Sequence, residues 1–187
     1  MKQSALPTLI QKCKKRDRRA QKALYEYCFS YLMRIALRYL SQREDATQLV
    51  NQAFLKVLLQ LDQYDPERPF LPWAGQITVR CAIDHYRQNT RRRESFLDPE
   101  LSAHAEALQI PPQVLDQLAW EDLQKIIAQL PATQRVVFNL KEWEGYSHQE
   151  IAAELNCSER SSKRYLEAAK QKLKALLKES YHLKIVI

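Results

Sequence analysis

Aromatic and basic side chains gather around three prolines at residues 66–72, where they could bind an unpaired nucleic-acid base. Proline fixes its own backbone and lacks an amide hydrogen, so three prolines in seven residues exclude a continuous helix and predict a rigid, shaped loop. An aromatic face stabilises an unstacked base by about 1–3 kcal/mol. The loop is therefore a candidate base pocket, and its candidate side chains are Gln63, Tyr64, Arg68, Phe70 and, at the head of the next helix, Trp73.

The same aromatic residues also fit a second role, because Trp73 and Ile77 repeat at helical spacing and Phe70 is equally suited to a hydrophobic core. The polar residues that follow point to nucleic acid. They recur at spacings of three and four, so they share one face of a helix, and a row of arginines can follow a phosphate backbone. This row comprises Gln76, Arg80, Asp84, Arg87 and Arg91.

A second candidate site lies near the C-terminus, where two helices are joined by a tight turn. Ser147 and Glu150 form a capping box, Asn156 suits a turn with positive φ, and Ser158 caps a final helix that we expect to run to about Leu177. This pattern is typical of a helix-turn-helix, whose second helix enters the major groove of DNA. The side chains available there for phosphates and base edges are Ser158, Arg160, Ser161, Lys163 and Arg164.

The prolyl loop must be positioned by the helix that precedes it, residues 43–61. Its apolar residues recur at helical spacing and predict a stripe against a core: Ala46, Leu49, Val50, Ala53, Phe54, Val57, Leu58 and Leu61. Ser41 and Glu44 predict a capping box at its start. The opposite face carries amides, which fit either a solvated surface or a docking face.

The remaining segments also favour helices. Residues 24–40 have the spacing of a core helix, and residues 120–130 and 132–140 have that of two more, the second ending near Gly145. Only two of the 187 residues are glycine, which disfavours a glycine-loop nucleotide enzyme. We therefore expect an all-α protein.

The net charge of +7 is unevenly distributed and predicts two basic modules. Residues 1–93 carry a net charge of +10, residues 94–122 a net charge of −7 and residues 123–187 a net charge of +4. The basic blocks favour a polyanionic partner. Residues 94–118, with three prolines and no Lys or Arg, predict a flexible acidic tether. Seven cations at residues 12–22 fit either a solvated helix face or a surface for phosphates.

Several classes of function are disfavoured. The four cysteines are far apart and the four histidines are scattered, so we expect neither a metal site nor a cofactor. The sequence shows neither a pair of catalytic carboxylates nor an activated nucleophile, so it does not predict an enzyme. No apolar run resembles a secretion signal or a membrane span, so we expect a cytoplasmic protein.

The order of residues in the N-terminal half resembles the second conserved region of extracytoplasmic-function (ECF) sigma factors, the promoter-recognition subunits of bacterial RNA polymerase. The resemblance rests on residues 43–46, 49–50, 54–55, 61–70, 73, 82–84 and 87. It implies that the loop and the following helix recognise the melted minus-10 element. It also implies that helix 43–61 docks on the coiled coil of the largest polymerase subunit through Asp45, Gln48, Leu49, Asn51, Gln52 and Lys56.

The C-terminal motif resembles the fourth conserved region of sigma factors, which binds the minus-35 element. Leu130-Pro131, residues 145–147, 150–152 and 155–158, Lys163 and Leu166 carry this resemblance. It implies a sigma region 2 bundle at residues 1–93, a linker at 94–118 and a sigma region 4 helix-turn-helix at 119–187. The implied partners are core RNA polymerase, promoter DNA and, as a further candidate, an anti-sigma factor.

The chain departs from the family pattern in several places, among them Asn156, which replaces the turn glycine of the family. Thr47, Gln48, Asn51 and Gln52 replace residues that are mostly acidic in the family, Arg80 replaces a frequent asparagine, and Ser162 stands where an apolar residue packs inward. We expect the Ser162 hydroxyl to bond back to helix carbonyls. The loss of acidic residues leaves an alternative: a sigma-derived DNA-binding regulator that no longer engages polymerase.

Overall fold

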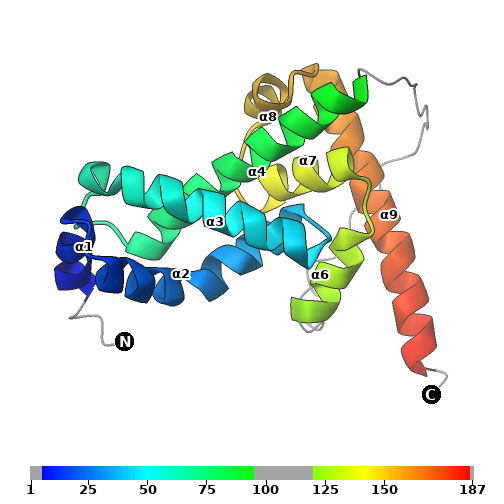
Figure 1. Ribbon diagram of the computed structural model, residues 1–187. Helices are drawn as coiled ribbons and strands as arrows, with labels where there is room; N and C mark the ends of the chain where they lie inside the picture. Colours follow the sequence, from blue (N-terminus) through cyan, green and yellow to red (C-terminus); the bar gives the residue numbers. More distant parts are fainter. Residues whose placement is uncertain (1–5, 95–119, 186–187) are drawn as a thin grey trace. The chain divides into compact units, whose positions relative to one another are not determined.

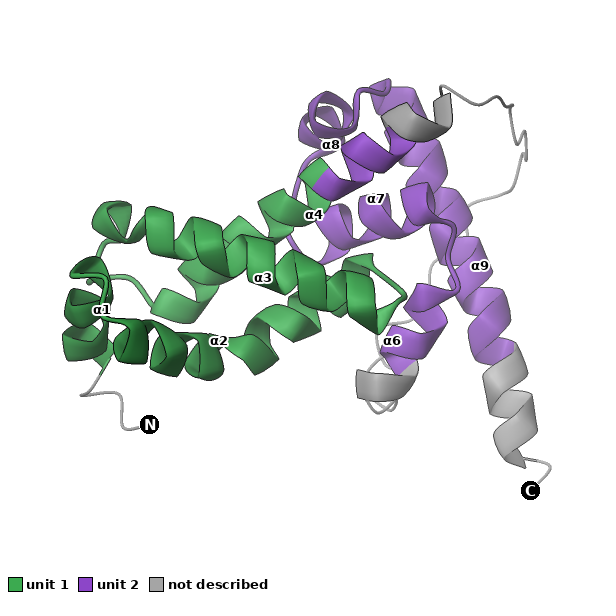
Figure 2. Cartoon of the chain, viewed as in Figure 1, with its two compact units in different colours: residues 1–84 green, residues 85–187 purple. Residues whose placement is uncertain are grey.

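Residues 6–94 and 120–185 are described by a computed structural model, and these residues form helices and no strands (Figure 1). The expected all-α class is therefore confirmed. By its internal contacts the chain divides into two compact units, residues 1–84 and 85–187 (Figure 2). The acidic tether expected at 94–118 lies, apart from Glu94, outside the described residues.

The first unit is built around a long central helix. Its elements are α1 (Leu6–Lys14), α2 (Arg18–Tyr39), α3 (Arg43–Leu59), a single 3-10 turn η2 (Leu61–Gln63) and the first part of α4 (Phe70–Glu94), which continues past the boundary at Asp84. Helix α2 packs against α1 and α3. Fully buried leucines and valines from α2 and α3 fill the core, as the apolar stripes predict: Leu24, Leu32, Leu49, Val50 and Val57.

Helices α2 and α4 approach closely at Gly75, a position that the sequence analysis did not single out. A Cβ atom built on Gly75 would lie 2.9 Å from Ile35 Cδ1 and 3.1 Å from Tyr31 Cε1. The absence of a side chain therefore lets α4 pack directly on α2. This contact fixes the start of α4, and with it the helix that follows the prolyl loop.

Two helix starts differ from the sequence-based prediction. Helix α3 begins at Arg43 with Gln42 as its N-cap, and no side chain caps it, so the predicted Ser41–Glu44 capping box is wrong. Helix α4 begins at Phe70, which puts Pro72 inside its first turn rather than in the loop. Proline is tolerated there because the first amides of a helix have no intrahelical partner.

In the second unit a long C-terminal helix packs against three shorter ones. The elements are α6 (Trp120–Ala128), α7 (Ala132–Glu142), α8 (His148–Leu155) and α9 (Glu159–Ile185), and α9 contacts α6, α7 and α8. The core includes the buried side chains of Ile127, Val137, Leu140 and Ile151. Helix α9 runs eight residues beyond the predicted end at Leu177.

Buried Arg135 closes the end of α6. Its Nη1 donates a hydrogen bond to the Ala128 carbonyl oxygen at 2.9 Å, so a cation occupies the negative end of the helix dipole. Burial lowers the pKa of Arg135 from its ordinary value. Gly145 adopts a φ of 76°, as expected for the chain reversal after α7. None of the described helices combines the length and apolar character that a bilayer crossing needs.

Candidate functional site

A tight turn shapes the prolyl loop of the first unit. The Tyr64 hydroxyl donates a hydrogen bond to the Arg68 carbonyl oxygen at 2.5 Å, and the Arg68 amide donates to the Asp65 carbonyl oxygen at 3.1 Å. The Asp65 carboxylate accepts from the Glu67 amide at 3.0 Å and lies 3.5 Å from Arg68 Nε. These bonds fix a backbone that Pro66 and Pro69 already restrict.

Three aromatic residues form a cluster at the base of this loop. The ring centroids of Tyr64 and Phe70 are 5.1 Å apart in an edge-to-face arrangement, and Trp73 lies 5.0 Å from Tyr64 and 5.5 Å from Phe70. Phe70 is 3% exposed and Tyr64 9%, whereas Trp73 is half-buried. Phe70 therefore belongs to the core, one of the two roles that its sequence allows. Of the three rings, Trp73 is the most accessible.

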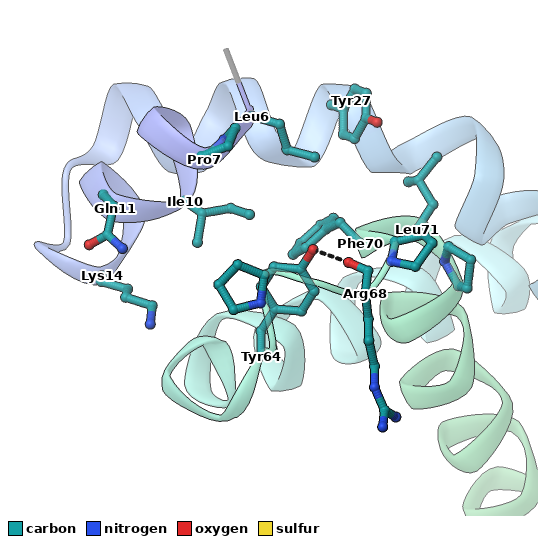
Figure 3. A pocket seen from close by; sticks show the side chains of 13 residues that line it. Leu6, Pro7, Ile10, Gln11, Lys14, Tyr27, Tyr64, Arg68, Phe70 and Leu71 are labelled. Carbon is teal, nitrogen blue, oxygen red and sulfur yellow. Dashed lines mark hydrogen bonds between the residues drawn. The ribbon is translucent and has the colours of Figure 1, made fainter. Parts of the chain in front are cut away.

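A pocket of about 360 Å³ opens between this loop and the N-terminal helix α1 (Figure 3). Tyr64, Arg68 and Phe70 line the loop side, which agrees with the pocket expected there. The other wall was not anticipated, because it comes from residues about fifty positions earlier in the chain. It consists of Leu6, Pro7, Ile10, Gln11 and Lys14. The volume is at the lower end of the range for small-ligand pockets.

The predicted polar row follows α4 away from the pocket. Gln76 and Arg80 are exposed, and half-buried Asp84 accepts a hydrogen bond from Lys56 of α3 at 3.1 Å. Arg87 belongs to the second unit, where its guanidinium forms an ion pair with Glu154. Arg91 lies within α4, but its side chain is outside the described residues.

The polar face of α3 presents most of its predicted residues to solvent. Asp45, Gln48, Asn51, Gln52 and Lys56 are exposed, and the Asn51 side-chain oxygen accepts a hydrogen bond from the Tyr25 hydroxyl at 2.7 Å. Leu49 is 1% exposed, so it supports the face from inside.

Two leucines that the sequence analysis did not assign to this face extend it. Leu55 is 59% exposed and Leu59 is 74% exposed. Their spacing from Gln52, three and seven residues, could have revealed them, because it places all three side chains on one side of the helix.

The helix-turn-helix of the second unit has the local structure that its sequence predicts. Ser147 and Glu150 form the capping box of α8, with Ser147 Oγ accepting from the Glu150 amide at 3.1 Å and Glu150 Oε2 accepting from the Ser147 amide at 2.7 Å. These bonds lower the pKa of Glu150. Asn156 forms the left-handed turn with a φ of 54°. Ser158 Oγ accepts from the Ser161 amide at 3.0 Å and so caps α9.

Four of the five residues predicted to contact DNA here lie in the first two turns of α9, and the fifth, Ser158, caps this helix. Arg160 and Arg164 are exposed, and Lys163 is held at 2.7 Å by Glu159. Ser161 Oγ lies 2.8 Å from Ser158 Oγ, so these two hydroxyls already bond to each other. The arginines are therefore the side chains best placed to reach an incoming partner.

The fully buried Ser162 does not use its hydroxyl as expected. Its Oγ lies 2.9 Å from His148 Nδ1 of α8, so the hydroxyl joins the two helices of the motif, whereas a bond back to helix carbonyls was predicted. Burial, together with Lys141, Lys163 and Lys170, lowers the pKa of His148. His148 is a residue whose structural role the sequence analysis missed.

Among the described residues, no group of His, Cys, Asp and Glu could hold a metal ion. The described cysteines are free thiols, and burial raises the pKa of Cys13 to about 11 and that of Cys28 to about 12. Thiols of this kind are poor nucleophiles and poor ligands. The features that remain are a helix-turn-helix, a motif typical of DNA-binding proteins, and an aromatic pocket on a helical bundle.

Comparison with known proteins identifies the family. The sigma-70 region 2 model matches residues 24–92, and the sigma-70 region 4 model matches residues 120–173, together about two thirds of the chain. The ECF RNA polymerase sigma factor EcfG of Rhodopseudomonas palustris (strain TIE-1) is 27% identical over 146 residues, covering 78% of each chain. The ECF sigma factor SigW of Bacillus subtilis (strain 168) is 25% identical over 181 residues, covering 91% of this chain and 95% of SigW.

Among solved structures, the sigma factor RpoE of Bartonella quintana, crystallised with the anti-sigma factor NepR, is similar with a TM-score of 0.48 and 22% identity. The match covers 84% of this chain and 96% of RpoE. The family assignment rests on the family models and the sequence relatives. The chain belongs to the ECF sigma factors of bacterial RNA polymerase. It is a sigma factor that directs core polymerase to promoters by binding specific DNA, and it is not an enzyme.

Proposed function

We propose that the chain carries out promoter recognition with three surfaces: the start of α9 for the minus-35 element, the prolyl loop with α4 for the melted minus-10 element, and the polar face of α3 for core polymerase. The domains are residues 1–93 and 119–187, tethered by 94–118. The observation that carries the proposal is the outward display of Arg160 and Arg164 on a capped helix-turn-helix. The same chain has a half-buried Trp73 that packs on two residues of the pocket lining, Tyr64 and Phe70.

The minus-35 surface is argued from the chemistry of its arginines. The guanidinium group binds the O6 and N7 acceptors of guanine with two hydrogen bonds, a pairing that contributes about 1–3 kcal/mol to discrimination between bases. Arg160 and Arg164 are four residues apart, on adjacent turns of α9. Ser158, Ser161 and Lys163 complete this surface by binding phosphates.

The minus-10 surface combines stacking with charge. Trp73 stacks on an unpaired base, Arg68 neutralises its phosphate, and Gln76 and Arg80 continue along α4. The rings of Tyr64 and Phe70 are mostly buried, so they support the loop from inside the fold. Gln63, Asp84, Arg87 and Arg91 complete the proposed set.

The polymerase surface is the exposed side of α3. Asp45, Gln48, Asn51, Gln52 and Lys56 offer hydrogen bonds, and the exposed Leu55 and Leu59 add apolar area that a partner would bury. A tether between the two DNA-binding modules then makes two weak contacts act as one specific contact, through effective concentration.

A specific feature of α3 also supports the alternative of a regulator that no longer engages polymerase. This face carries three amides, Gln48, Asn51 and Gln52, beside the single carboxylate Asp45, and the Thr47 hydroxyl donates to the Arg43 carbonyl oxygen at 2.8 Å. A neutral face gains little from electrostatic steering towards a basic partner.

A pull-down of the full-length chain with core bacterial polymerase separates the two functions. Binding of wild-type protein to core polymerase supports the sigma function, and the double variant Gln48→Ala with Gln52→Ala should bind polymerase more weakly. A matched control, Lys172→Ala on α9, should not. Failure of wild-type protein to bind, with binding restored by Thr47→Glu, Gln48→Asp and Gln52→Glu, would establish the regulator instead.

The family also suggests the cellular compartment in which the chain works and one further partner. A sigma factor acts where its polymerase is, so we infer that the chain works in the cytoplasm. Because a structurally similar sigma factor was crystallised with an anti-sigma factor, such a protein is also proposed as a partner, and co-purification from the native cell would reveal it.

A further inference from the structure

The corner between α1 and α2 is a dense cluster of positive charge next to the prolyl-loop pocket. Residues 12–19 contain six cations and one acid. We propose that this corner binds the phosphates of single-stranded DNA whose neighbouring base occupies the pocket. The proposal rests on the function proposed for the prolyl loop and extends that site to α1 and its corner, whose cations the sequence alone left open between a solvated face and a surface for phosphates.

The backbone of this corner is held in a conformation that favours glycine, yet it carries an arginine. Helix α1 ends in a Schellman motif, in which the Asp17 amide donates to the Lys12 carbonyl oxygen at 3.2 Å and the Arg16 amide to the Cys13 carbonyl oxygen at 2.9 Å. Arg16 occupies the left-handed position with a φ of 60°. A side chain that persists at a strained position points to a function for that side chain.

The single acid of the corner is engaged with backbone amides. The Asp17 carboxylate caps α2 by accepting from the Arg19 amide at 2.8 Å and the Ala20 amide at 3.1 Å, and these bonds lower its pKa. Lys15, Arg16 and Arg18 are exposed, and no ion pair is recorded for them within the described part of the chain. Their charges are therefore available to an external anion.

Helix α1 contributes residues to both the corner and the pocket. Leu6, Ile10 and Gln11 of α1 form a wall of the pocket (Figure 3), and Lys14 lies at its edge, 3.4 Å from Asp62 of η2. The helix has nine residues, so it is about 14 Å long and its two functions are close together. A strand that inserts a base here must bring its adjacent phosphates past the cations.

The chemistry favours a single strand over other polyanions. Sites for single-stranded DNA combine a positively charged track along the backbone with an aromatic platform for the bases. The corner supplies the track, and the pocket, whose aromatic lining is Tyr27, Tyr64 and Phe70, supplies the platform. A rigid duplex would keep its bases stacked and leave the pocket unused.

The test compares two double variants that remove the same charge. Lys15→Gln with Arg16→Gly alters the corner, and Lys172→Gln with Lys178→Gln alters exposed positions of α9. The holoenzyme formed by each full-length chain and core polymerase is titrated with a promoter that carries a pre-melted bubble. Because glycine suits the left-handed position, the corner variant should melt at the same temperature as wild type or higher, which separates binding from folding.

We expect the corner variant to bind the bubble about tenfold more weakly at low salt. The slope of log affinity against log salt should become shallower by about 1.4, or about 0.7 for each lost phosphate contact. The control variant should stay within about twofold of wild type. Equal weakening in both variants, or weakened binding of core polymerase without DNA, would overturn the proposal.

If wild-type protein fails to bind core polymerase, the proposed function is wrong, and the corner is then tested on its own. The full-length chain is titrated with a labelled oligothymidine, which has phosphates but no promoter sequence. Weaker binding by the corner variant than by the control supports the proposal, and equal binding refutes it.

Discussion

The Lys56 ammonium group on α3 lies 3.1 Å from the Asp84 carboxylate on α4. One residue belongs to the face proposed for polymerase and the other to the face proposed for promoter DNA, so this ion pair links the two surfaces. The hydrogen bond to Asp84 is the main reason why the pKa of Lys56 is raised. Both side chains are 46% exposed, so solvent screens the pair.

A double-mutant cycle of Lys56→Met and Asp84→Asn should yield a coupling free energy of about 0.2–1 kcal/mol, measured by urea unfolding at neutral pH. The folded-state pKa of Lys56 is raised, so its contribution is fully present at neutral pH and is lost only as the pH rises above the ordinary lysine range. Repeating the cycle in 1 M salt should reduce the coupling. A coupling that does not change with salt would contradict an exposed ion pair.

Arg164→Ala and Arg80→Ala should each reduce promoter-dependent transcription without changing the thermal melting temperature, because both side chains are exposed. For Arg164, loss of a two-bond contact to guanine predicts a decrease of about 5- to 150-fold, and relaxed preference at one base pair of the minus-35 element. Unchanged initiation by both variants would remove these two residues from the site.

Phe70 and Trp73 should behave differently although they are neighbours. Phe70→Ala removes a core ring, so it should lower the free energy of unfolding by about 3–5 kcal/mol in a denaturant titration. Trp73→Ala should cost less stability and should slow initiation on duplex promoters. A pre-melted template should restore initiation by Trp73→Ala, since opening is the step that it impairs. A defect that persists on the pre-melted template would show that opening is not the step that Trp73 assists.

The stability of the second unit should decrease as the pH falls below about 6.5, because the pKa of His148 is lower in the folded state than in the unfolded state. The unfolded chain then binds more protons, which favours unfolding. Lys141, Lys163 and Lys170 oppose the charged form of His148, and Glu159 favours it. His148→Gln should flatten the pH profile between pH 7.5 and about 5.5 in thermal melts. An unchanged profile would exclude His148 as its source.

Local patterns were sufficient to predict the helix-turn-helix. The capping box at Ser147, the left-handed turn at Asn156 and the cap at Ser158 depend on residues within four positions of one another, so their geometry follows from the residue types. The buried stripe of α3 follows equally well from helical periodicity. The general place of the loop pocket was also predictable, since proline acts locally.

Features that depend on distant parts of the chain were missed. The α1 wall of the pocket and the close approach at Gly75 arise from tertiary packing, which spacing along one helix does not encode. Ser162 and His148 are fourteen residues apart in the sequence, and the Ser162 hydroxyl bonds to His148 instead of to the carbonyls of its own helix. The Ser41 capping box failed because the helix starts one residue later, after Gln42.

Reconstituted transcription from a promoter library tests the central claim most directly. Core bacterial polymerase is incubated with the library, with and without the full-length chain, and the templates that yield transcripts are sequenced. We predict that the chain enriches templates sharing two sequence elements at a fixed separation, and that Arg164→Ala relaxes only the upstream element. Transcription that the chain does not change, or enrichment without a shared upstream element, would contradict the account.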